Sequence, residues 1–161
     1  MVFFILIRSG WIMPNLKQGF SAYLQTLSSI SAGILADRIY PNLAPQGATF
    51  PYITFFIQDD EKPVHLLGAS ALSRDTITVN IYAQTPESRT ACLELLRNAL
   101  HGRINIDFPQ DTGTLDVRSI KMMGFSESFE DPTDGSQQGS FVAQVDFLVV
   151  WAEPVPTLPT S

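Results

Sequence analysis

The sequence is poor in cysteine, histidine and basic residues. One cysteine and two histidines occur in 161 residues, so no intrachain disulfide can form, and the lone cysteine weakly favours a reducing compartment. Ten Lys and Arg residues are scattered among sixteen Asp and Glu, which gives a net charge of −6. A protein that grips duplex DNA needs clustered cations against the phosphates, so the composition argues against that class.

The N-terminus lacks a membrane-spanning segment and a secretory signal. Its apolar run, Val2–Ile7, ends at Arg8, whereas a membrane helix needs roughly 20 apolar residues. No basic segment precedes the run and no small-residue cleavage site follows it, so we expect no membrane association. We interpret residues 1–12 either as an appended or mis-assigned leader, with Met13 as the start, or as an N-terminal arm packed on a neighbour.

The remaining chain has a globular composition, with 45% hydrophobic and 16% charged residues. Its length suits one domain with a normal hydrophobic core, which we place at residues 13–152. Residues 153–161 contain three prolines and are expected to form an extended tail.

Hydrophobic spacing predicts two helices. Asn15 can cap a first helix over 15–36, with Gln18 as its reciprocal capping partner. A second helix is expected after Thr85, which can cap it and is followed by proline, and it should end at Gly102.

Four strands are predicted, at 52–58, 73–83, 115–127 and 141–151. In the second strand, Ile77, Val79 and Ile81 alternate with polar residues, so they should share a buried face. The order α-β-β-α-β-β lacks a regular strand-helix-strand rhythm. It predicts an α+β fold with a mainly antiparallel sheet of about four strands and two helices packed on one face.

The stretch "RIYPNLAPQGATFPYITF" is too short and too apolar for a linker. Pro41 should end the first helix near Arg38, because the residue before proline avoids the helical conformation. Pro45 should begin a turn, and Pro51 suits the start of a strand. We interpret the stretch as a stiff joint between the first helix and the first strand. Its residues are Arg38, Tyr40, Pro41, Pro45, Pro51 and Tyr52.

No residue pattern predicts a catalytic, cofactor or metal site. Cys92 falls on the apolar face of the second helix, and His101, nine residues later, lies about 13 Å further along the axis. A Cys92–His65 pair stays open. The acidic run at 59–61 is better interpreted as a solvated loop tip, since consecutive carboxylates cannot converge on one cation. The chain has neither a glycine-rich phosphate loop nor a Gly-x-Ser-x-Gly motif.

Apolar residues also occur on expected connections, notably in the long connection 58–74. Either another chain covers them or they fold back onto their own domain. The first alternative predicts a subunit interface there, with a second connection, 128–140, also able to reach a neighbour. The predicted interface residues are Asp59, Asp60, Val64, His65, Leu66, Leu67, Arg74 and Arg118.

Three segments resemble one known family. "LADRIYPNLAPQGATFPYITF" resembles the "RIYP … PQ … FPYI" signature of tail-completion proteins of long-tailed bacteriophages. "LSRDTITVNIYAQTPESRTACLELLRNALHG" resembles the family's next strand and helix, and "GSFVAQVDFLVVW" resembles its last strand, with Asp146, Phe147 and Trp151. The resemblance covers about residues 15–152 in order.

The resemblance implies a structural virion or prophage protein without enzymatic activity or cofactors. Such proteins form a ring, of six copies by resemblance, that caps the tail tube, stops its polymerisation and joins it to the head connector. The implied partners are other copies, the tail tube protein and head–tail connector proteins. The implied location is the head–tail junction of the virion, and the host bacterial cytoplasm during assembly.

An acidic ring would let DNA pass through its lumen without specific binding, since the net charge of −6 repels phosphates. Two alternatives remain. One is another tail tube or baseplate component of related fold, and the other is a small enzyme that uses Cys92, His65 or the acidic run.

Overall fold

The computed structural model describes residues 15–59, 64–65, 68–69, 72–111, 113–131 and 139–152. The predicted N-terminal arm and C-terminal tail lie outside the described residues, as do the predicted interface residues Asp60, Leu66 and Leu67. The elements are α1 (Leu16–Thr26), α2 (Ser28–Ser31), β1 (Ile39–Pro41), β2 (Tyr52–Asp59), β3 (Val64–His65), β4 (Gly68–Ala69), β5 (Leu72–Ala83), α3 (Pro86–Leu100), β6 (Ile104–Pro109), β7 (Thr114–Glu130) and β8 (Ser140–Ala152).

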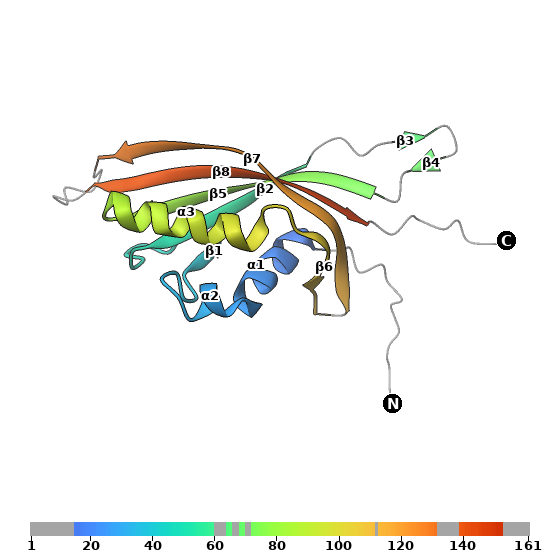
Figure 1. Cartoon of the computed structure of the whole chain (residues 1–161), viewed down its shortest axis with the longest axis horizontal. Coiled ribbons are helices and arrows are strands. Elements are labelled where there is room, and N and C mark those ends of the chain that lie inside the picture. The colour runs from blue at the N-terminus through green and yellow to red at the C-terminus, as the bar shows by residue number, and fades with distance from the viewer. Residues whose placement is uncertain are drawn as a thin grey trace, which may run out of the picture.

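One large sheet dominates the structure. Its six strands follow the order β1-β2-β5-β8-β7-β6, and β3 and β4 form a separate two-stranded sheet. β1 pairs with β2 in parallel, and the other neighbours in the large sheet are antiparallel. Figure 1 shows α1 and α3 on the same side of this sheet, with β6 and the adjoining part of β7 curling round toward α1. The sheet is therefore a mixed, curled half-barrel.

The predicted fold is wrong. We expected an α+β fold with about four antiparallel strands and two helices in the order α-β-β-α-β-β, but the described residues are mostly sheet, with six strands in the main sheet and three helices. β1 was missed because its Ile-Tyr-Pro sequence resembles a turn entry. β6 was missed because it is short and alternates poorly, with Ile104 66% exposed and Phe108 fully buried.

The first helix is shorter than predicted. It ends at Thr26, because Leu27 takes an extended conformation, and α2 is a separate single turn. Pro41 therefore does not stop a helix and instead closes β1. Serine side chains compete for backbone hydrogen bonds, which is consistent with the helix breaking at Leu27, next to the serine-rich segment 28–31.

The cap of α1 is only partly as predicted. The Asn15 side chain accepts a hydrogen bond from the Gln18 N–H at 3.1 Å, as expected. The reciprocal bond comes from elsewhere, because Gln110 accepts from the Asn15 N–H at 3.2 Å and donates to the Asn15 carbonyl at 3.1 Å. Gly19 allows the close approach behind this contact, since an added Cβ would lie 3.0 Å from Phe108 Cβ. The contact holds α1 against the end of β6.

The core lies between the sheet and the helices. The expected alternation in β5 is confirmed, since Ile77, Val79 and Ile81 are fully buried. Phe20 of α1 packs edge-on against Phe55 of β2, with ring centroids 4.9 Å apart. The helix side of the sheet is thus the buried side, and the opposite side is called the outer face below.

The start and end of α3 are as predicted. The Thr85 side chain accepts from the Ser88 N–H at 3.1 Å, and Pro86 occupies the first turn. Gly102 follows the helix with a φ of +77°, a conformation that favours glycine.

One arginine side chain holds the joint between α2 and β2 by donating to two backbone carbonyls. The Arg38 Nε donates to the Pro51 carbonyl at 2.8 Å, and its Nη2 donates to the Ile34 carbonyl. Pro45 begins a turn in which the Ala48 N–H donates to its carbonyl at 3.1 Å. Pro51 directly precedes β2. The joint thereby places the loop 42–50 over one end of the sheet's outer face.

Candidate interaction surfaces

The described part of the predicted interface clusters at one end of the sheet. Asp59 pairs in register with Asp75, the residue after Arg74. Arg74 and Ser119 are both register partners of Val150, so Arg74 and Arg118 come from strands on either side of β8. Val64 and His65 form β3. The other predicted residues lie outside the described ranges, so the predicted surface is only partly placed.

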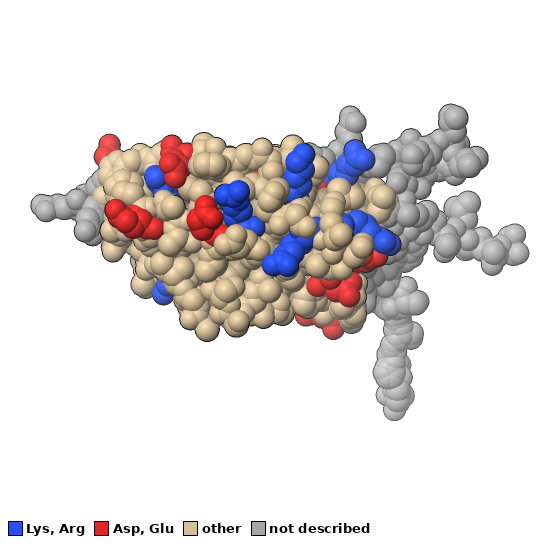
Figure 2. Space-filling view, in the orientation of Figure 1, with Lys and Arg blue, Asp and Glu red and all other residues tan. Residues whose placement is uncertain are grey.

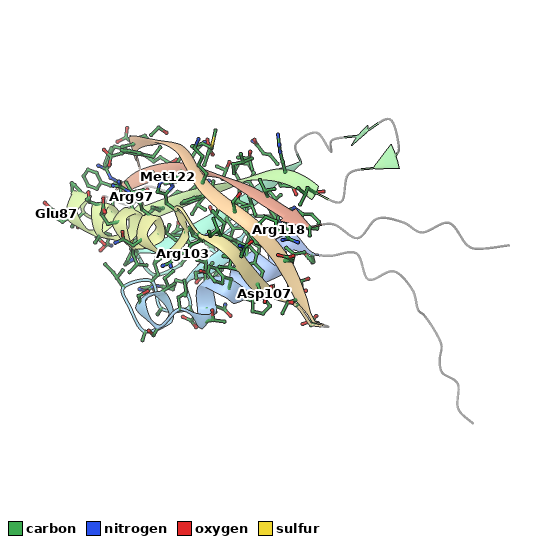
Figure 3. All side chains as sticks on the ribbon, turned by 45° about the vertical axis from the view of Figure 1, so that its right-hand side comes forward. Glu87, Arg97, Arg103, Asp107, Arg118 and Met122 are labelled. Atoms are coloured by element: carbon green, nitrogen blue, oxygen red, sulfur yellow. The ribbon has the colours of Figure 1, made fainter. Side chains whose placement is uncertain are left out.

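The two predicted arginines differ. Arg118 forms an ion pair with Asp116, with 2.8 Å between Nη2 and Oδ2 and both side chains about half exposed. Arg74 is exposed on β5 and has no ion pair with a carboxylate among the described residues. Figure 3 shows Arg118 and Arg103 toward the β6 side of the molecule, with Glu87 at the opposite end of α3.

Charges are unevenly spread over the helix-covered side. Figure 2 shows carboxylates gathered at the left-hand end, with Lys and Arg across the middle and right-hand end above a second acidic group. The two ends of the molecule therefore differ in charge on this side.

The second half of β7 is a surface that the sequence did not predict. β6 pairs only with Thr114–Ser119, and Gly124–Glu130 pairs with β8 alone within the described ranges, with Met123 at a register shift. Met123, Phe125 and Phe129 are exposed by 58%, 57% and 53%. We call Met123–Glu130 the open edge. The one available signal was the irregular alternation of "KMMGFSESFE", which predicts no consistent inward face.

The open edge is held in place although its apolar side chains are exposed. Glu127 forms an ion pair with Arg89 of α3, with 3.0 Å between Oε1 and Nη2. The same guanidinium lies 5.8 Å from the ring centroid of Phe141, against which Phe129 packs edge-on at 5.0 Å. The strand therefore presents a preformed surface.

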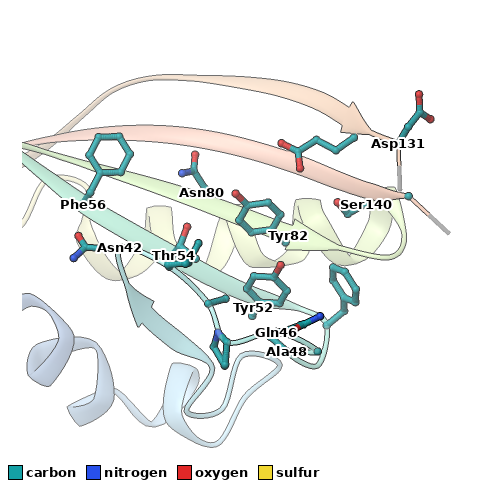
Figure 4. A pocket seen from close by; sticks show the side chains of 17 residues that line it. Asn42, Gln46, Ala48, Tyr52, Thr54, Phe56, Asn80, Tyr82, Asp131 and Ser140 are labelled. Atoms are coloured by element: carbon teal, nitrogen blue, oxygen red, sulfur yellow. The ribbon is translucent and has the colours of Figure 1, made fainter. Parts of the chain in front are cut away.

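A pocket of about 890 Å³ lies at the end of the outer face where β7 terminates. Strands β2 and β5 supply its floor, the 42–50 loop supplies one wall, and the end of β7 with the start of β8 supplies the other, as Figure 4 shows. The wall and the floor come from segments far apart in the sequence, so no local pattern indicates the pocket.

Aromatic rings form much of the pocket floor. Tyr52 and Tyr82 stack with centroids 4.9 Å apart, and Phe50 lies 5.3 Å from Tyr52. Burial raises the pKa of both tyrosine hydroxyls, and the nearby Glu130 carboxylate raises both further. Both phenols are therefore neutral at physiological pH.

The rim of the pocket is acidic. Glu130 and Asp131 line it, and both are exposed. Lys, Arg and His do not occur among the described residues that line it, whereas Asn42, Gln46 and Asn80 offer amides. Aromatic rings beside carboxylates favour a cationic ligand.

The side chains of Cys92 and His101 are engaged within the fold, the first by packing and the second by a hydrogen bond. Cys92 is fully buried on the apolar face of α3, as predicted, and burial raises the pKa of its thiol to about 11, although the charge of Arg38 acts in the opposite direction. The Nδ1 of His101 accepts from the Met122 N–H at 3.1 Å. The His65 side chain is not described, so the Cys92–His65 pair remains untested.

Metal-binding clusters and membrane-spanning helices are both missing from the described residues. In the described part of the chain, no group of three or more His, Cys, Asp or Glu residues is placed to hold a metal ion. The helices described here are all too short or too polar to cross a membrane.

Comparisons with known proteins add little. No protein-family model matches the chain, and no curated protein matches it. One solved structure, of a protein without a descriptive name, aligns with a TM-score of 0.43 and 14% identity, over 86% of this chain and 95% of its own. A similarity this low supports neither a shared fold nor a shared function.

Proposed function

We propose that this chain is a structural subunit of a bacteriophage or prophage tail. Copies of it form a ring that caps the tail tube and joins the tail to the head. The ordered resemblance of residues 15–152 to tail-completion proteins suggests this role. The observation that carries the proposal is the open edge, with its three exposed apolar side chains.

An open edge of this kind favours contact with another protein chain. The unpaired N–H and C=O groups along an edge strand readily pair with a further strand. Met123, Phe125 and Phe129 add apolar area that a second chain would remove from water. When the open edge of one copy meets a different patch on the next copy, the contact is head-to-tail, and such a contact closes into a ring when its rotation permits.

The proposed ring has defined partners and a defined place. It contacts other copies, six by resemblance, the tail tube protein and head–tail connector proteins at the head–tail junction. DNA passes through its lumen without specific binding, in keeping with the net charge of −6. The ring assembles in the host cytoplasm and requires no cofactor.

Native mass spectrometry and light scattering of the full chain, alone and with tail tubes, test the proposal. We expect a closed ring of several copies, or a ring that forms on the tube end. Phe125→Ser should prevent assembly, because it removes an apolar contact at the centre of the open edge. Ile104→Ser is the matched control, since Ile104 is equally apolar and 66% exposed but lies on β6.

Two outcomes would contradict the proposal. A chain that stays monomeric at all concentrations and never binds tubes would exclude the ring. Growth into open tubes, seen by electron microscopy, would instead favour the alternative of a tail tube component.

A further inference from the structure

The two ends of β5 carry complementary chemistry on the outer face. Tyr82 contributes to the pocket floor near one end of the strand, and Arg74 lies eight residues earlier. The even spacing places both side chains on the same face, about 26 Å apart. A basic side chain and an acidic, aromatic pocket therefore lie near opposite ends of β5, both on the outer face of the sheet.

The described lining of the pocket contains no cationic side chain. Glu130 and Asp131 on its rim have no ion pair with a described residue, and no lining residue is basic in the described part of the chain. The stacked rings of Tyr52 and Tyr82 add a surface that attracts a cation. With about 890 Å³, the pocket has room for a long side chain and part of the backbone that carries it.

Arg74 is the basic residue best placed to fill such a pocket on another copy. Arg89, Arg97 and Arg118 each have a carboxylate within 3.6 Å. Arg74 is exposed and has no such partner among the residues described here. Lys121 is also exposed without a described ion pair, but it lies midway along β7 and not at the far end of the sheet.

We propose that Arg74 of one copy inserts into the pocket of the next copy, beside Tyr52 and Tyr82 and between the carboxylates of Glu130 and Asp131. This inference rests on the proposed ring and specifies its contact between subunits. Opposite ends of the molecule meet in this contact, so each copy gives one arginine and receives another, as a head-to-tail ring requires. The open edge ends at the pocket rim with Glu130, so the two surfaces adjoin at this end of the molecule.

Charge-reversed variants of the full chain test the contact by native mass spectrometry. Arg74→Glu keeps an intact pocket, and the double variant Glu130→Lys, Asp131→Lys keeps an intact arginine. Each variant alone should remain monomeric. An equal mixture should assemble into alternating copies, because the reversed charges of one variant are complementary to those of the other.

Milder variants guard against a loss of folding. Arg74→Gln removes only the charge and should raise the concentration for half-assembly at least about tenfold. Lys121→Glu is the matched control, and it should assemble like the unmodified chain. The far-ultraviolet circular dichroism of every variant should be unchanged, since Arg74, Glu130 and Lys121 are exposed.

The results separate this contact from the proposed ring. Normal ring assembly by Arg74→Glu would overturn the contact, and the ring proposal would stand if Phe125→Ser still blocked assembly. A mixture of the two charge-reversed variants that stays monomeric would also overturn it. If the unmodified chain neither oligomerises nor binds tubes, the proposed function fails as well.

Discussion

The two halves of β7 belong to one strand but have different surroundings. Thr114–Ser119 pairs with β6, β8 joins its other side from Val117 onward, and Val117 is fully buried. The open edge, Met123–Glu130, has β8 on one side only in the described structure, and its phenylalanines are more than half exposed. The larger apolar side chains are thus on the exposed half. Burial along this strand depends on whether α1 and β6 cover it, and not on how apolar its residues are.

The largest difference in stability should be between a substitution in β6, which covers the first half of β7, and one in the open edge. Phe108→Ala in β6 should lower the free energy of unfolding by about 3–5 kcal/mol, because it leaves a cavity beside Phe20 and Tyr23. Phe125→Ala in the open edge should cost less than about 1 kcal/mol, since its ring is 57% exposed. Urea unfolding of both variants measures the difference. Equal losses would show that the open edge is packed in the free chain.

A pH effect should mark the covered side under α3. The pKa of the Cys92 thiol is raised from 9.0 to about 11, mainly by burial, so folding favours the neutral thiol. This contribution is complete below about pH 9 and is lost as the pH rises toward 11, by at most about 2.7 kcal/mol at 1.36 kcal/mol per pKa unit. Urea unfolding between pH 8 and about 11 measures the loss. The Cys92→Ala variant should lack this component, and the same decline in both chains would contradict it.

The smallest effect should concern the tether of the open edge to α3. Glu127→Gln removes the ion pair with Arg89 and should lower stability by no more than about 1 kcal/mol, because Glu127 is 40% exposed. Amide hydrogen exchange should become faster at 123–130 and stay unchanged at 114–119. The matched control is Asp116→Asn, which removes the ion pair with Arg118 in the other half of β7. Uniform exchange changes along β7 would show that the two halves behave as one unit.

Sequence reasoning succeeded where local chemistry decides structure. Thr85 and Pro86 define the start of α3 through a side-chain cap and a compatible φ. The alternation of Ile77, Val79 and Ile81 identified the buried face of β5, since successive strand residues point to opposite sides.

It failed where a distant partner decides structure. β6 has a weak strand pattern, yet it pairs with β7 and buries Phe108 against α1. The capping role assigned to Gln18 belongs to Gln110, 95 residues away from Asn15 in the sequence. Contacts of this range leave no periodic signal in the chain.

The candidate interaction surfaces likewise contain one residue that the sequence predicted and one pocket that it did not. Arg74 was predicted as a possible ion-pair partner at an interface; it is exposed on the outer face, and its interface role stays a prediction. The pocket was not predicted, because its floor at Tyr52 and Tyr82 and its rim at Glu130 meet only in the folded sheet.

The sequence by itself determined the side-chain caps of Asn15 and Thr85, the turn at Pro45 and the alternation that buries one face of β5. These features depend on side chains within a few residues of the backbone groups they satisfy. Only the tertiary structure decided the curl of the sheet, the open edge and the acidic aromatic pocket. Each of these depends on which strand lies beside another, and strand pairing is set by contacts between distant segments that bury apolar area together.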